Sequence, residues 1–316
     1  MIWLAWRTHR AALIIALVFL GIVATFSVIT GLMMRADFTS LGLSACDMYH
    51  PSLACGDAWA TFSGKYDVLT TWNELFTLTP LVAGILVGAP LVASELERKT
   101  SLLVWTQGVT RMRWLVGMLL GVFAGTIALF AAFSLLNTWW LDPIIQLDGR
   151  FGPNIFDVAG IVPIAYAAFA LALGIAAGAL LGKTLPAILV TIVGYFPLRM
   201  AVARGLRPYH FVAPIDVTGE SIPATGPGDW QLGGGIVDRA GHPVDAMTFQ
   251  NTCLSSPSVG NDTVRQCLHD HGWVQYIIYH PDAHFWPLQY AESVFFIALA
   301  VVLLAVTFAV VWRRDA

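Results

Sequence analysis

The fold is decided by the longest uncharged stretch of the chain, WLVGMLLGVFAGTIALFAAFSLLNTWWL, at residues 114–141. These 28 residues lie between Arg113 and Asp142 and include no acidic, basic or histidine side chain. A helix needs about 20 apolar residues, at 1.5 Å each, to cross the ~30 Å hydrocarbon core of a bilayer. The stretch therefore predicts a membrane-spanning helix.

Five further uncharged stretches repeat this pattern along the chain. Four of them have 20 or more residues, and the fifth, 184–198, has 15 residues before Arg199. We extend this fifth stretch to residue 203, with the long Arg199 side chain reaching toward the membrane surface. The sequence predicts an all-α membrane protein with six transmembrane helices, at 11–34, 75–94, 114–141, 158–182, 184–203 and 288–312.

Composition supports this fold class. Of the 316 residues, 57% are hydrophobic and 12% are charged, whereas a soluble domain has about 25% charged residues. This balance excludes a soluble enzyme and a disordered protein, and the net charge of −3 gives no reason to expect nucleic acid as a partner. A signal peptide is the alternative for the first span, but 24 uncharged residues exceed the about 7–15 of a signal-peptide core. We expect a retained helix.

The charges predict an orientation, since six spans place both termini on one side. Nine basic and three acidic residues fall on that side, a balance of +6, and the other eight basic and 17 acidic residues give −9. Basic residues beside span ends favour the cytoplasm. We therefore expect both termini and residues 95–113 to be cytoplasmic. Residues 35–74 and 142–157 would form extracellular loops, and residues 204–287, rich in glycine, proline and aspartate, a loop-rich extracellular domain.

All four cysteines fall in the predicted extracellular segments. An even number of cysteines on the oxidising side predicts disulfides. Three pairings are open, and we favour Cys46–Cys55 and Cys253–Cys267 because they close short loops. Free thiols or metal ligands are the alternative, although the spacings of 9 and 14 residues match no zinc motif.

Two segments beside the spans carry aromatic residues. Residues 1–10 hold Trp3, Trp6, Arg7 and Arg10, which predict an interfacial helix along the inner leaflet or, equally, a simple aromatic and cationic anchor. Aromatic residues also crowd positions 273–290, before the last span, and a short re-entrant or surface-lying helix is one interpretation of them.

Three predicted spans carry glycines at a spacing of four residues, which aligns them on one helix face and lets two backbones approach closely in lipid. These packing candidates are Gly84 and Gly88, then Gly117, Gly121 and Gly125, and then Gly174, Gly178 and Gly182. The pattern predicts close helix contacts and says nothing of a ligand.

No pattern predicts catalysis, a metal site or a cofactor in this chain. Residues 178–184 resemble the end of a nucleotide-binding loop, but Ala177 stands where the motif requires glycine. The pairs His280 and His284, and His269 and His271, belong to no zinc box. The central parts of the spans carry no ionisable side chain, so an ion-driven carrier is not expected. Any transport would need a separate source of energy.

The segment between the second and third spans is the most informative for function. It reads SELERKTSLLVWTQGVTRMRW at 94–114, and two glutamates stand in an otherwise basic loop. Apolar side chains there could pack on a partner while the charged ones pair with it. The residues expected to do so are Glu95, Glu97, Arg98, Lys99, Thr100, Trp105, Arg111 and Arg113.

This segment resembles the coupling region of ABC-2-type exporter permeases. Three other pieces are similar to an actinobacterial subgroup of that family: Trp3 to Arg10, Arg207-Pro208-Tyr209, and the run from Phe285 to Glu292. The resemblance implies that residues 94–107 form a coupling helix docked on an ABC ATPase and that residues 1–10 form a connecting helix. Lys99 departs from the family, which often has glycine there.

The resemblance also implies a function and partners. Six helices would form half of a pathway that a second permease copy completes, and a separate ATPase would bind Mg-ATP. The predicted function is thus the permease subunit of an exporter for hydrophobic or amphipathic compounds, in contact with membrane lipids and without nucleic acid. The alternatives are a non-transporting scaffold or sensor with a ligand-binding ectodomain, and a membrane-embedded enzyme, for which no intramembrane catalytic residue is present.

Overall fold

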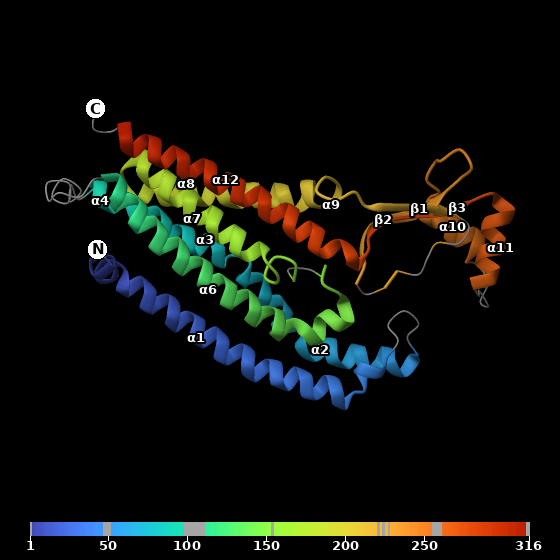
Figure 1. Cartoon of the computed structure of the whole chain (residues 1–316). Helices are drawn as coiled ribbons and strands as arrows, with labels where there is room; N and C mark the ends of the chain where they lie inside the picture. The colour runs from blue at the N-terminus through green and yellow to red at the C-terminus, as the bar shows by residue number, and fades with distance from the viewer. Residues whose placement is uncertain are drawn as a thin grey trace.

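The computed structural model describes residues 2–46, 52–97, 111–152, 155–219, 222, 225–226, 228–254 and 261–313. It shows an elongated bundle of helices with a small sheet beyond one end (Figure 1). Both chain termini lie at the opposite end, together with the end of α4. We call these the sheet end and the N/C end of the bundle.

The helices and strands follow one another along the chain in this order. The helices are α1 (Ile2–Ser40), α2 (Leu53–Phe76), α3 (Thr79–Ala83), α4 (Ala89–Glu97), α6 (Arg111–Asp148), α7 (Val162–Leu181), α8 (Thr184–Ala201), α9 (Arg207–Tyr209), α10 (Ala246–Cys253), α11 (Asn261–His271) and α12 (Phe285–Arg313). Short helical turns are η1 (Leu43–Ala45), η2 (Gly84–Gly88), η3 (Val202–Leu206) and η4 (Asp282–His284), and the strands are β1 (Ile215–Gly219), β2 (Trp230–Val237) and β3 (Val274–His280).

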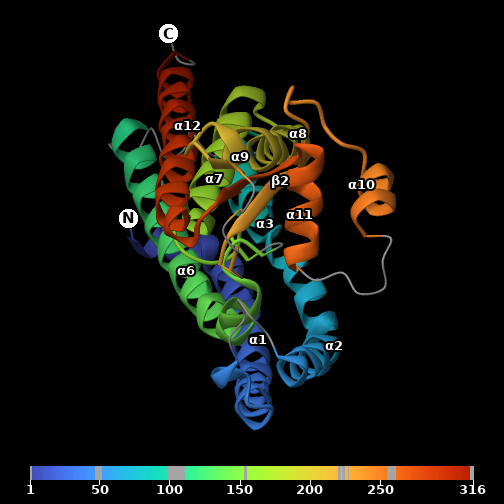
Figure 2. The ribbon, with the colours of Figure 1, turned by 90° about the vertical axis from the view of Figure 1, so that its right-hand side faces the viewer.

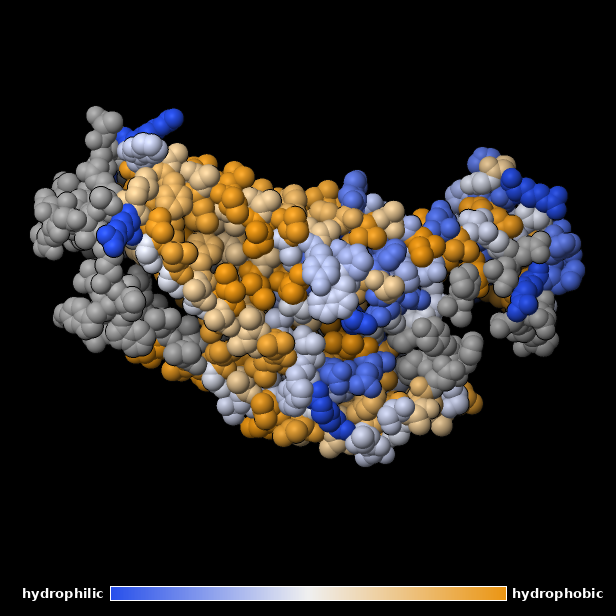
Figure 3. Space-filling view, viewed as in Figure 1, coloured by the Kyte–Doolittle hydropathy of each residue, from blue (hydrophilic) through white to orange (hydrophobic). Residues whose placement is uncertain are grey.

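Six helical stretches of the described residues are long and apolar enough to cross a membrane, as the sequence predicts. They are Leu20–Ser40, Thr71–Glu97, Leu115–Asp148, Val162–Leu181, Thr184–Tyr209 and Asp282–Arg313. Apolar side chains cover much of the bundle, and hydrophilic ones gather toward the sheet end (Figure 3). This distribution fits a bundle surrounded by lipid, because only such a solvent tolerates so much exposed apolar surface.

Several helices are longer than the uncharged stretches that predict them. Helix α1 has 39 residues, or about 58 Å at 1.5 Å per residue, and its first turns run at an angle to the rest (Figure 2). Residues 2–10 thus belong to the same continuous helix as the first span, and their place along the inner leaflet stays a prediction. Helix α6 continues past Leu141 to Asp148 with Pro143 inside it. A charged residue therefore limits the apolar surface of a helix but does not end the helix.

Helix α7 is the centre of the bundle. Its span is 78% buried, whereas the other five spans are between 22% and 39% buried. Helices α3, α4, α6, α8 and α12 all pack against it. Tyr166 and Phe169 of α7 lie in the main core with Phe296 of α12 and Tyr195 of α8. A helix that is apolar on all sides, as α7 is, belongs in such a position.

The glycines separate into two groups in the structure. A Cβ added at Gly84, Gly88, Gly174 or Gly178 would meet a backbone oxygen of the facing helix at 2.5–2.7 Å, so only glycine allows α3–η2–α4 to lie this close to α7. Around Gly117, Gly121 and Gly125 no atom lies within 4 Å of such a Cβ among the described residues. Gly182 ends α7 in a left-handed conformation, with φ of 63°, which favours glycine at this position.

The segment predicted as a loop at 35–74 is largely helical. Helix α2 fills most of it and is capped by Ser52, whose hydroxyl accepts a hydrogen bond from the Cys55 amide. The Cys46–Cys55 disulfide closes the connection between α1 and α2, as the short loop predicts. Phe38 of α1, Phe62 of α2 and Trp140 of α6 are buried in one apolar cluster, which gives this region a core of its own.

The segment between α9 and α12 contains an antiparallel sheet in the order β1-β3-β2, with α10 and α11 beside it (Figure 2). Residues 274–280 are a central strand, so the interpretation of this aromatic run as a re-entrant or surface helix is wrong. Tyr276, Ile277 and Tyr279 are aromatic or β-branched, and such residues favour a pleated, half-buried strand. The disulfide Cys253–Cys267 joins α10 to α11, as predicted.

Candidate functional site

A cluster of charged side chains is buried at the sheet end of the helices, and no local pattern predicts it. Arg199 lies on α8, Arg207 on α9, Glu292 on α12, and Asp157 in the turn before α7. Glu292 is fully buried, and the two arginine side chains are less than 10% exposed. Tyr166 of α7 lies among them and is also fully buried. We call these five residues the charge cluster.

Arg207 is the centre of the charge cluster. Its Nε donates to Glu292 Oε2 at 2.7 Å, and its Nη2 lies 2.9 Å from Glu292 Oε1, a bidentate pair. The same Nη2 lies 2.6 Å from Asp157 Oδ1 and 2.9 Å from the Tyr166 hydroxyl. Phe156 lies beneath the guanidinium, 4.2 Å from ring centroid to Cζ. These contacts join α7, α9 and α12.

Arg199 completes the charge balance of the cluster. Its Nη2 lies 2.8 Å from Asp157 Oδ2, so Asp157 binds both arginines. The prediction that Arg199 reaches to the membrane surface is wrong, because its side chain is only 6% exposed and is paired inside the protein. The two positive charges of the arginines formally cancel the two negative charges of the carboxylates. This pairing explains how four ionisable groups tolerate burial that would be costly for any one of them alone.

The charge of Asp157 is maintained despite its burial. Burial would raise the pKa of its carboxyl, but the Arg207 and Arg199 guanidinium groups and the hydrogen bonds from Arg207 and Tyr166 hold that pKa below its ordinary value. Asp157 is therefore ionised at neutral pH, and the ion pairs with both arginines persist.

Gln289 supports the charge cluster from one turn earlier on α12. Its Oε1 accepts hydrogen bonds from the Ile161 and Val162 amides, each at 3.0 Å, and these amides belong to the unsatisfied N-terminus of α7. Its Nε2 donates to the Phe156 carbonyl at 3.0 Å. Gly160 has a φ of 73°, and a Cβ there would lie 2.7 Å from Gln289 Oε1. The turn before α7 thus packs directly against the side-chain amide of Gln289.

A histidine pair joins the sheet to the same region. His280 ends β3, is fully buried, and its Nε2 lies 2.9 Å from the Pro208 carbonyl oxygen. Its Nδ1 lies 3.0 Å from Nδ1 of His284, so one nitrogen donates and the other accepts. Trp230 of β2 stacks on His280 with centroids 5.5 Å apart. Burial lowers the pKa of His280, the Pro208 hydrogen bond opposes this, and His284 lowers the pKa further.

At the N/C end, one predicted coupling residue binds within the chain. Glu97 is the last residue of α4, and its Oε2 accepts hydrogen bonds from the Thr184 hydroxyl at 3.0 Å and the Thr184 amide at 3.2 Å. Glu95 is half-buried two residues earlier, and Arg113 is exposed near the start of α6. Arg98, Lys99, Thr100 and Trp105 lie outside the described residues. So do the side chains of Trp3, Trp6, Arg7, Arg10 and Arg111, whose backbone is helical.

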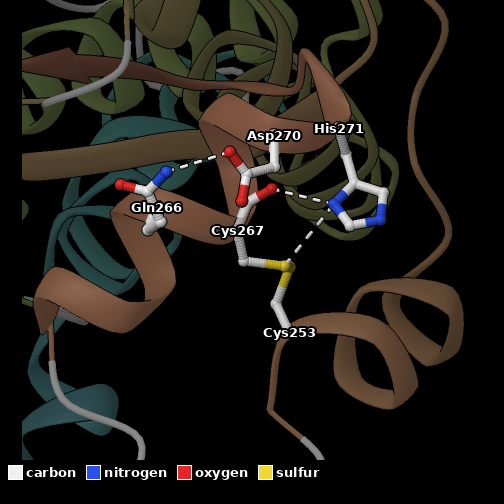
Figure 4. Close-up of a disulfide and its surroundings, with 5 residues drawn as sticks. All are labelled: Cys253, Gln266, Cys267, Asp270 and His271. Atoms are coloured by element: carbon white, nitrogen blue, oxygen red, sulfur yellow. Dashed lines mark hydrogen bonds between the residues drawn. A yellow bond between two sulfur atoms is a disulfide. The ribbon is translucent and has the colours of Figure 1, made fainter.

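The second disulfide has a histidine beside it (Figure 4). His271 Nδ1 lies 2.9 Å from the Cys267 carbonyl oxygen and 3.7 Å from Cys267 Sγ, while Gln266 Nε2 donates to Asp270. Cys253, Cys267 and His271 bring potential metal-ligand atoms together. Because the two sulfurs are bonded to each other, this group offers a cation a single histidine nitrogen, which is not a metal site.

The six apolar helices, of which five lie mainly at the surface of the bundle, define a multi-pass membrane protein. A family model described as "ABC-2 membrane transporter related" matches residues 17–207, which contain four of the six candidate spans and nearly all of a fifth. The chain belongs to this family. It is therefore a permease-type transport component of the cell membrane, and the family implies an ABC ATPase subunit as its partner. Neither a curated protein nor a solved structure matches the chain.

Two of the sequence segments that carry the family resemblance contribute residues to the charge cluster and its surroundings. Arg207-Pro208-Tyr209 supplies the guanidinium and the carbonyl that accepts from His280. The run from Phe285 to Glu292 supplies Gln289 and the paired carboxylate. A signal was present in the sequence for two members of the charge cluster, because Arg199 ends the uncharged run 184–198 and Glu292 directly precedes the run 293–312. A charge there needs a partner.

Proposed function

We propose that this chain is the transmembrane subunit of an ATP-driven exporter of hydrophobic or amphipathic compounds, of the drug, antibiotic or lipid class. A separate ABC ATPase would bind and hydrolyse Mg-ATP. The family match over residues 17–207 carries this proposal. A second copy of the chain, or a related permease, would complete the pathway.

The described spans support an apolar cargo. Three of their buried hydroxyl side chains donate within the protein: Thr191 to the Ala187 carbonyl, Thr307 to the Leu303 carbonyl, and Ser134 to the Gly160 carbonyl. The charge cluster is likewise paired internally. The surface that these helices offer to a compound is therefore mostly apolar (Figure 3), which suits a ligand that partitions into lipid.

The proposal includes an orientation, with the N/C end in the cytoplasm. Since all four cysteines form disulfides, a single introduced cysteine is the only free thiol. In intact cells, a membrane-impermeant maleimide should label Tyr209→Cys at the sheet end and should label Arg113→Cys only after permeabilisation. Labelling of Arg113→Cys alone in intact cells would show the opposite orientation.

The partner separates this proposal from the scaffold or sensor alternative. Mild-detergent purification of the tagged chain from its native membranes should recover an ABC ATPase in stoichiometric amount, identified by mass spectrometry. A scaffold or sensor has no need of one. Repeated purification without any ATPase would favour the alternative, in which the sheet region binds a ligand.

A further inference from the structure

Glu97 links two helices at the N/C end through an N-terminal cap. The first amides of a helix have no partner within it, and the helix dipole places partial positive charge there, so a carboxylate is favoured at that position. Glu97 takes this role for α8 by accepting from both the amide and the hydroxyl of Thr184. The last described residue before 98–110 is thereby bound to the first residue of α8.

Glu97 itself is exposed, and α4, α7 and α8 pack closely one to two turns further into the bundle. Ala89 of α4, Ala177 of α7 and Ala187 of α8 are buried in one cluster. A Cβ at Gly178 would lie 2.7 Å from the Ala89 carbonyl oxygen, so α4 and α7 are in direct backbone contact. Only Gly182 and Lys183 separate α7 from α8. Close-packed interfaces of this kind transmit a displacement instead of absorbing it.

The other end of the same helical stretch enters the charge cluster. Helix α8, η3 and α9 form one candidate span, Thr184–Tyr209, of 26 residues. Near its far end, Arg199 binds Asp157 and Arg207 binds both Asp157 and Glu292. Polar contacts therefore fix this stretch at both ends, to α4 at the N/C end and to α7 and α12 at the sheet end.

We propose that the stretch 184–209 carries a displacement of the end of α4 to the charge cluster, and that Glu97 is the positioning residue that engages this stretch. This inference rests on the proposed function, with the ATPase docked on residues 94–107 as the family resemblance implies. A displacement of Glu97 would move the N-terminus of α8, and a shift of the helix along its axis would change the Arg199 and Arg207 ion pairs. Sliding of packed helices is a known form of such a transition.

The test uses the complex of the chain with its ATPase and a thiol reporter at Tyr209→Cys, a position that is 52% exposed at the end of α9. The reaction rate of this thiol with an impermeant maleimide is measured in the nucleotide-free complex and in the complex trapped with ATP and vanadate. We expect the two rates to differ by about fivefold or more, the range of typical coupling between sites.

Adding Glu97→Ala should abolish this nucleotide-dependent difference, measured on the fraction of the complex that retains the ATPase. Thr184→Val keeps the shape of the side chain but removes the hydroxyl donor, so it should reduce the difference, and Thr184→Ser should restore it. Lys183→Ala is the matched control, because it alters an exposed neighbour without removing the cap, and it should respond as the parent does.

The possible outcomes are distinct. A full nucleotide response with Glu97→Ala and with Thr184→Val would overturn this inference and leave the proposed function intact. A parent complex that hydrolyses ATP but shows no response at Tyr209→Cys would overturn it in the same way. If the ATPase does not co-purify with the parent chain, the proposed function fails and the inference fails with it.

Discussion

Arg207 and Glu292 show what a single buried charge requires from its neighbours. Removing one member of a buried ion pair leaves an uncompensated charge, at a cost of about 3–5 kcal/mol. We expect Arg207→Ala to lower the free energy of unfolding by this amount, measured by thermal unfolding in detergent. Arg150→Ala is the control, because its pair with Asp282 is 38% and 42% exposed and should be worth about 0–1 kcal/mol. Equal losses from the two variants would contradict the role given to the charge cluster.

His280 provides a second test at the residue scale, through pH. Burial lowers its pKa below the ordinary 6.5, so below that pH the unfolded chain binds more protons than the folded protein. Stability should therefore fall as the pH falls below 6.5, and stop falling once the folded protein is also protonated. His280→Gln should show a smaller drop in unfolding temperature between about pH 7 and pH 5. An identical drop would assign the pH dependence to other groups.

The charge cluster also shows a limit of sequence analysis. Arg207 and Glu292 are 85 positions apart, and the pairing of two charges so distant leaves no local periodicity. The sequence does indicate that Glu292 needs a partner, since it adjoins the uncharged run 293–312. It does not indicate which partner. The Glu97 contact with Thr184 is missed for the same reason, because the two residues are 87 positions apart.

At the scale of elements, the glycines give a matched pair of substitutions. A Cβ at Gly174 would lie 2.5 Å from the Gly84 carbonyl oxygen, whereas no atom of a described neighbouring element lies within 4 Å of one at Gly121. Gly174→Ala should therefore destabilise the protein by about 1–3 kcal/mol through overpacking. Gly121→Ala should be neutral or stabilise by up to about 1 kcal/mol, because alanine favours the helix. Thermal unfolding of both variants decides this, and equal effects would contradict the close packing of η2 on α7.

The elements differ in how well the sequence predicts them. All six spans are predicted, because the length of an apolar stretch is a local property. Their ends are not, since α1 and α6 continue beyond the membrane-length stretch. The sheet is missed because β3 is short and its aromatic residues also suit a membrane surface. Its antiparallel pairing with β1 and β2 joins segments that are far apart in the sequence.

For the whole molecule, the central claim is that this chain conveys the work of an ATPase through the membrane. The measurement compares ATP hydrolysis by the ABC ATPase that co-purifies with this chain, in liposomes with and without the chain. We expect the ATPase to bind the liposomes only when the chain is present, and its vanadate-sensitive hydrolysis rate then to change. An ATPase that stays in solution and hydrolyses ATP at the same rate in both samples would contradict the proposed function.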